Sequence, residues 1–123
     1  MANPNIVSVT SIYGKTAYLT PTDTASNVLL ANAAASGTVL KINQIVAANI
    51  DGTNAADVSA FITKSGGSPI AIASTISVPA DATLNLIDKN SSFYLEEGDN
   101  IEAGASADND LTITISYEEI DDA

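Results

Sequence analysis

The sequence predicts an all-β protein: one antiparallel β-sandwich domain, of the jelly-roll or Ig-like kind, with about 8 to 10 short strands. Apolar residues alternate with polar ones in many short runs, which is the period of a strand. Turn residues such as Gly, Pro, Asp and Asn separate these runs at regular intervals. No segment of helical period is long enough to cover a sheet. A chain of 123 residues is expected to fold as one domain, over residues 1–123.

The N-terminal third predicts a hairpin and a third strand. Residues 5–13 and 16–20 are rich in β-branched and aromatic side chains, and Gly14 and Lys15 separate the two runs. Residues 24–31 are the next strand candidate. Alanine and leucine in residues 27–35 would also allow two turns of helix, although we favour the strand.

The strongest strand signal lies in residues 38–50, TVLKINQIVAANI. Even spacing places one apolar set on a single face: Leu40, Ile42, Val46, Ala48 and Ile50. The residues expected to form the core are Val9, Leu40, Ile42, Val46, Ile62, Leu86, Ile101, Ile113 and Ile115. Further strands are predicted at residues 58–64, 70–78, 84–88, 93–95, 100–105 and 111–118.

Composition argues against an enzyme. The chain has no cysteine and no histidine, so it lacks a thiol nucleophile, a disulfide framework and the usual general base near neutral pH. Serine and threonine are abundant, but no residue pattern would activate one of them. A pair of carboxylates of the glycosidase type stays open, because their separation depends on the fold.

The charge restricts the partners. Four basic and fifteen acidic residues give a formal net charge of -11, which repels nucleic acid phosphates. No run of residues is apolar and long enough for a membrane helix, and the start of the chain does not resemble a secretory signal. We therefore expect neither nucleic acid nor a membrane as a partner, and a soluble protein made in the cytoplasm.

One acidic cluster is the candidate metal site. In the segment LEEGDNIEA, carboxylates surround Gly98 and could bind a hard cation such as Ca²⁺. The candidate ligands are Glu96, Glu97, Asp99 and Glu102. We favour the alternative, in which these residues form a solvated hairpin turn without chemistry, because the spacing matches no calcium-loop signature. Neither a metal nor a cofactor is therefore predicted.

Three other loops carry weaker signals. Residues 51–57, DGTNAAD, fail the EF-hand test because Ile62 stands where a bidentate Glu is needed. Residues 108–110 are a second acidic tip, interpreted as a hairpin. The SGGSP segment at residues 65–69 lacks the spacing of a phosphate-binding loop.

Three segments carry a resemblance to a known family. SIYGKTAYLT, ANAAASGTVLKINQIVAANIDGTNAADV and TISVPADATLNLIDKNSSFYLEEGDNIEAGAS resemble short virion structural proteins of tailed bacteriophages, particularly phages of marine bacteria. The resemblance spans residues 11–120 and consists of small residues, turns and strands. It carries no functional residue.

This resemblance implies a non-enzymatic virion protein, with the virion as its location after assembly in the host cytoplasm. It favours a capsid decoration protein, a homotrimer that binds the major capsid protein or another virion protein. A neck, collar or tail component and a glycan-binding receptor module remain alternatives. The polar ends, residues 1–5 and 119–123, are candidate flexible arms.

Overall fold

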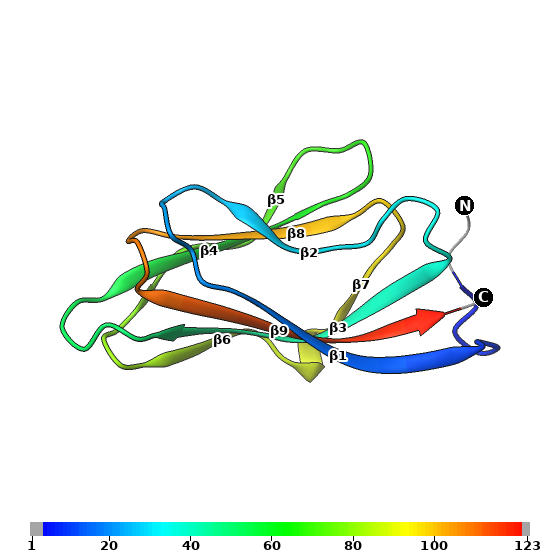
Figure 1. Cartoon of the computed structure of the whole chain (residues 1–123), viewed down its shortest axis with the longest axis horizontal. Coiled ribbons are helices and arrows are strands. Elements are labelled where there is room, and N and C mark those ends of the chain that lie inside the picture. Colours follow the sequence, from blue (N-terminus) through cyan, green and yellow to red (C-terminus); the bar gives the residue numbers. More distant parts are fainter. Residues whose placement is uncertain (1–3, 122–123) are drawn as a thin grey trace.

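The computed structural model describes residues 4–121 and consists of two antiparallel sheets packed face to face (Figure 1). Within this range the chain forms nine strands and a single three-residue 3₁₀ helix at Lys89–Ser91. The all-β single-domain prediction is therefore confirmed, as is the number of strands.

The first sheet contains five strands, with β1, β9, β3 and β6 side by side in that order and β7 paired to β3. Their bounds are β1 Ser11–Leu19, β3 Thr38–Asn49, β6 Thr83–Ile87, β7 Phe93–Leu95 and β9 Leu111–Asp121. The second sheet has the order β2, β8, β4, β5. Its strands are β2 Asn27–Ala31, β4 Ala56–Thr63, β5 Ile70–Val78 and β8 Asn100–Ala105.

The strand pairs are nested around the middle of the chain. β4 pairs with β5, β3 with β6, β2 with β8 and β1 with β9, all antiparallel. Such nesting across two packed sheets is the jelly roll, so the jelly-roll alternative is right and the Ig-like one is wrong. It also means that most connections cross from one sheet to the other, whereas β4 and β5 form a hairpin.

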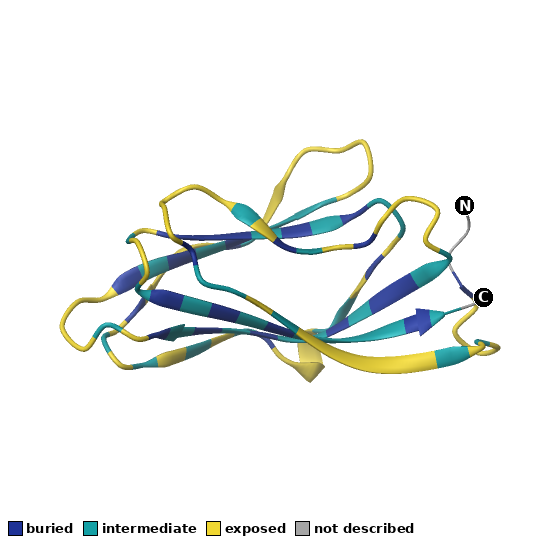
Figure 2. Cartoon of the chain, in the orientation of Figure 1, coloured by how far each residue is buried: buried dark blue, intermediate teal, exposed yellow. Residues whose placement is uncertain are grey.

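The core lies between the sheets. Figure 2 shows buried and less buried residues alternating along the strands, as period-two packing requires. Five of the predicted core residues are buried: Leu40, Ile42, Ile101, Ile113 and Ile115. Ile62 and Leu86 are only partly buried, and both pack against this core.

A β-bulge in β3 overturns part of the predicted core face. The pairing of β3 with β9 shifts register between Ile42 and Gln44, which inserts one extra residue into β3. Because side chains alternate along a strand, one extra residue reverses the faces beyond it. The residues buried beyond the bulge are Ile45, Ala47 and Asn49. The prediction for Val46, Ala48 and Ile50 is therefore wrong, and Ile50 is 61% exposed.

The N-terminal hairpin is also wrong. β1 is one continuous strand that pairs with β9 through Gly14 and Lys15 without a register shift. Gly14 does not have the positive φ of a turn residue. Its weak preference for a turn is outweighed by the nine-residue ladder between β1 and β9. Val9 precedes this strand and is half-buried outside the core, so its core prediction is wrong.

Part of each predicted arm packs against the rest of the described chain. β9 continues to Asp121, so residues 119–121 form a strand, and the prediction of a C-terminal arm is wrong there. Ile120 is buried and pairs with Ile12 of β1 and Val39 of β3. Pro4 is buried as well, contrary to the expected N-terminal arm. Residues 1–3 and 122–123 of the predicted arms lie outside the described residues.

Candidate functional site

The acidic cluster lies where β7 of the first sheet leads into β8 of the second, so its turn is not a hairpin. Asp99 in this turn is 2% exposed. Its carboxylate accepts hydrogen bonds from the backbone amides of Ser65 and Glu96, each at 2.9 Å, and from Lys64 Nζ. We call these four residues the Asp99 clamp, since they join the β7–β8 turn to the β4–β5 turn. The prediction of a solvated turn is wrong for Asp99.

The clamp stabilises the charged form of Asp99. Burial raises the pKa of the Asp99 carboxyl, but the hydrogen bonds from Lys64, Ser65 and Glu96 outweigh it and hold this pKa below its usual value. The hydrogen bond to Asp99 in turn raises the pKa of Lys64. A second carboxylate supports Lys64, because Glu96 Oε2 lies 3.1 Å from Lys64 Nζ. Asp99 and Lys64 are therefore both charged at neutral pH, with Asp99 buried and the Lys64 side chain 45% exposed.

Glycine is required in this turn. Gly98 has a φ of +84°, a conformation that side chains other than glycine rarely adopt. A Cβ atom there would lie 2.8 Å from Ser65 Oγ and 2.9 Å from Ser65 Cβ. The close approach of the two turns therefore depends on the missing side chain.

The four predicted ligands do not converge on one point. Glu97 Oε2 accepts a hydrogen bond from the Gly37 amide at 3.0 Å, and the buried Glu97 Oε1 atom has no hydrogen-bond partner among the described residues. Glu102 lies within β8, opposite Phe61 of β4. Over residues 4–121 no group of three acidic side chains is placed to hold a metal ion. Lys64 occupies the position that a cation would take beside Asp99.

Two buried asparagines that the sequence did not single out form hydrogen bonds at opposite ends of the sandwich. Asn32 Nδ2 donates to the carbonyls of Thr38 and Leu95, each at 3.0 Å. Asn49 Nδ2 donates to the carbonyls of Asn54 and Val78. Both residues satisfy buried carbonyls where the chain crosses between sheets. Their neighbours in the sequence carry no signal for this role.

The other two acidic loops are also crossings between the sheets. Residues 51–55 lead from β3 to β4, and residues 106–110 lead from β8 to β9, so the hairpin prediction for 108–110 is wrong. A hydrogen bond from the Thr53 amide lowers the pKa of Asp51. Asn109 has a φ of 61°, which asparagine tolerates better than most residues. These contacts are those of structural turns.

These features define a class: a single-domain jelly roll with polar crossings fastened by hydrogen bonds. In the part of the chain that the structure describes, no helix is long and apolar enough to cross a membrane. The chain is similar to one in the acid-stable capsid structure of Helicobacter pylori bacteriophage KHP30. That match has a TM-score of 0.51 at 9% identity and covers 94% of this chain and 92% of the other.

A weaker likeness is to a chain in the structure of infectious bursal disease virus, Gt strain. It has a TM-score of 0.42 and 12% identity, and it covers 93% of this chain but 32% of the viral one. No protein family model matches the chain, and no curated protein matches it in sequence. At 9% identity, the likeness to the phage capsid chain shows a shared fold and no more.

Proposed function

We propose that this chain is a non-enzymatic virion structural protein, a decoration protein on the outer surface of a bacteriophage capsid. The observation that carries the proposal is the shared jelly roll with a chain from a phage capsid, which extends over nearly the full length of both chains. The sequence resemblance to short virion proteins of tailed phages supports the same role.

A decoration protein acts by contact, and β1 offers a contact edge. Within residues 4–121, β9 is the one strand that pairs with β1, so the other edge of β1 presents backbone groups that no strand of this range pairs. Three large side chains of β1 are exposed, with Ile12 at 53%, Tyr13 at 54% and Tyr18 at 75%. We call this the β1 edge, and we propose that it contacts the major capsid protein or a neighbouring copy.

The high negative charge of the protein is compatible with attachment to a capsid through many weak contacts. Every copy carries a formal charge of -11, so copies repel one another at low ionic strength. Closed symmetry uses one small patch several times, and multivalent contacts add up on a capsid. A homotrimer is the assembly we propose.

Sedimentation with shells tests this role directly. Purified protein is mixed with capsids from the encoding phage that lack it, at low and at intermediate salt. We expect it to pellet with the shells, more tightly as salt screens the carboxylates. Tyr18→Glu at the β1 edge should weaken binding, while Val28→Glu, on β2 and similarly exposed at 55%, should not. Protein that stays in the supernatant at every salt concentration would rule out decoration.

Electron microscopy separates decoration from the alternative of a neck, collar or tail component. Intact virions and tailless capsids of the same phage are compared for density of this size. Decoration predicts density over the whole shell of both particles. Density confined to the portal vertex or the tail would transfer the proposal to the alternative.

A further inference from the structure

A small hollow opens on the outer face of the second sheet, away from the Asp99 clamp and from β1. It has a volume of about 200 Å³. Its lining comes from β4, β5, β8 and the segment before β2, with hydroxyl side chains in the majority. We call it the β4 hollow, since its central residues, Asp57, Ser59 and Phe61, belong to β4.

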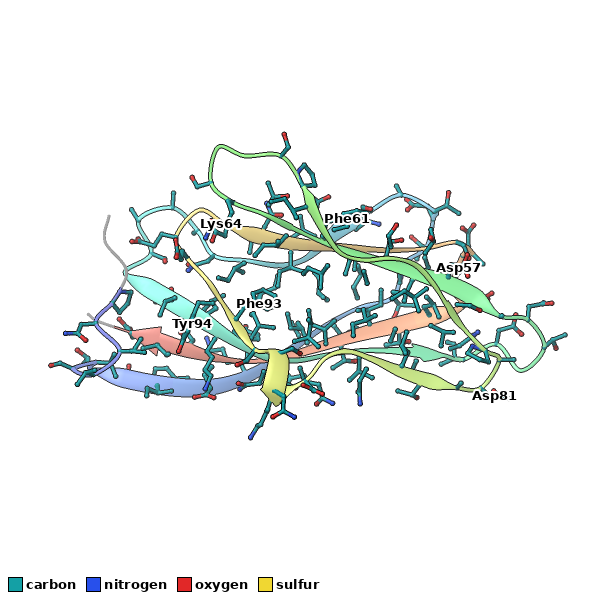
Figure 3. The ribbon with its side chains drawn as sticks, turned by 180° about the vertical axis from the view of Figure 1, so that it is seen from behind. Asp57, Phe61, Lys64, Asp81, Phe93 and Tyr94 are labelled. Atoms are coloured by element: carbon teal, nitrogen blue, oxygen red, sulfur yellow. The ribbon has the colours of Figure 1, made fainter. Side chains whose placement is uncertain are left out.

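The alternation of β4 builds the hollow. Val58 and Ala60 point into the core with no exposed surface, so Asp57, Ser59 and Phe61 between and beside them face outward. Figure 3 shows Asp57 and Phe61 apart along this strand. They flank Ser59, so a carboxylate and an aromatic ring stand at opposite ends of the hollow.

A glycine lets the segment before β2 form a wall of the hollow. Gly104 of β8 lies opposite Ser59 and has no side chain to hold that segment away. A Cβ atom on Gly104 would lie 3.2 Å from the Ala25 carbonyl oxygen and 3.4 Å from Ser26 Cα. The segment before β2 is therefore packed closely over Gly104, and Thr24 and Ser26 form one wall.

Two serine hydroxyl groups in the hollow can donate hydrogen bonds to a ligand. Ser59 Oγ accepts a hydrogen bond from the Thr75 amide at 2.9 Å, and Ser106 Oγ accepts one from the Asp57 amide at 2.8 Å. Each oxygen is thereby fixed while its proton remains available. Thr75 has a φ of 46°, an unusual conformation for a β-branched residue, which its bond to Ser59 helps to hold.

The carboxylate is available as an acceptor. No hydrogen bond or ion pair from residues 4–121 reaches the Asp57 carboxylate. The hollow thus combines an unoccupied carboxylate acceptor, two hydroxyl donors whose oxygens are held by backbone amides, and an aromatic ring. This combination suits polyhydroxylated rings, because their hydroxyls both donate and accept while their C–H faces pack on aromatic rings.

We propose that the β4 hollow binds one neutral hexopyranose unit, such as the terminal residue of a glycan. Its volume is below the range of about 300 to 1,000 Å³ typical of drug-sized ligands, which limits the occupant to one small ring. Asp57 and the net charge of -11 repel phosphates and acidic sugars. This inference does not rest on the decoration role, since the purified chain alone should bind the sugar.

The test is a titration of the ¹⁵N-labelled full chain, followed by amide shifts in NMR spectra. The probes are the methyl pyranosides of glucose, galactose and mannose, with N-acetylneuraminic acid as the anionic comparator. At least one neutral probe should produce saturable shifts at Ser59, Thr75 and Gly104 below about 50 mM, the range of weak small-ligand binding. The acidic sugar should not.

Variants with matched controls locate the binding. Phe61→Ala should weaken it about fivefold through the lost aromatic face, and Asp57→Asn about tenfold through the lost charged acceptor. Tyr94→Ala removes an exposed aromatic ring from the other sheet, and Asp81→Asn removes an exposed carboxylate outside the hollow, so both should bind normally. If Phe61→Ala fails to fold, Asp57→Asn decides.

Three results would overturn the proposal. They are the absence of saturable shifts with every neutral probe, shifts confined to residues outside the hollow, and equal or tighter binding of the acidic sugar. Loss of binding to capsids in the sedimentation test would leave this titration unaffected, so failure of the two proposals can be told apart.

Discussion

Asp99 and Asp57 are chemically identical side chains in opposite situations. Asp99 is 2% exposed and accepts hydrogen bonds from three donors. Asp57 is half-buried on the outer face of β4, and no donor of the described chain reaches its carboxylate. The groups that the fold brings to a carboxylate therefore decide whether that carboxylate stabilises the structure or stays available to a ligand.

The positions of Asp99 and Asp57 in the jelly roll explain why one carboxylate has three donors and the other has none among the described residues. Asp99 lies where a crossing between the sheets meets the β4–β5 hairpin, so two turns supply donors from both sides. Asp57 lies on an open sheet face, where neighbouring strands use their amides for pairing with one another. Of its neighbours, Ser59 Oγ accepts a hydrogen bond from the Thr75 amide, and Ser106 Oγ accepts one from the amide of Asp57 itself.

The largest expected difference is in stability. Asp99→Ala leaves the backbone amides of Ser65 and Glu96 without their acceptor and removes one of the two carboxylates beside Lys64, so the free energy of unfolding should fall by about 3 kcal/mol. Asp57→Ala should change it by less than about 0.5 kcal/mol. Urea unfolding followed by circular dichroism measures both. Equal losses in the two variants would remove the distinction between the two carboxylates.

Two glycines, one in the Asp99 turn and one that lines the β4 hollow, give a second, smaller contrast. Gly98→Ala combines a positive φ with contacts under 3.0 Å to Ser65, so it should cost about 2 kcal/mol. Gly104→Ala has no positive φ, and its Cβ would lie 3.2 Å from the Ala25 carbonyl oxygen, a tight contact that should cost about 1 kcal/mol. Thermal unfolding gives the order. A greater loss at Gly104 would show that the β4 hollow, and not the clamp, is the tighter junction.

The acid response should depend on Asp99. Its folded pKa lies below the unfolded value, so its contribution is fully present above the unfolded pKa of about 3.9 and is lost as the pH falls toward the folded pKa. Unfolding midpoints measured from neutral pH down through this range should therefore fall less in Asp99→Asn than in the unchanged protein. Asp81→Asn is the matched control, and it should keep the original slope.

The smallest effect is expected from calcium. The acidic side chains around Gly98 do not converge, and Lys64 already lies beside Asp99. Millimolar Ca²⁺ added to chelator-treated protein should shift the melting midpoint by less than about 1 °C. A rise of several degrees that Glu97→Gln abolishes would restore the metal-site hypothesis.

The positions of most strands could be predicted from the sequence. The bounds of β5, β7 and β8 agree with the predicted residues 70–78, 93–95 and 100–105. The core face of β9, with Leu111, Ile113 and Ile115, was also predictable. Alternation and turn chemistry are properties of neighbouring residues, so they can be recognised without knowing which strands pair.

Which strands pair with one another became clear only from the three-dimensional structure. Local period does not encode which strand lies beside which, so nested pairing, and with it the jelly roll, could not be told from an Ig-like sandwich. The bulge in β3 appears only against β9, which is why Val46 was assigned to the wrong face. Asp99 meets Lys64 across 35 positions of sequence, and the β4 hollow unites four separate segments. Contacts at such separation arise when the two sheets pack, because packing alone brings these donors, acceptors and glycines together.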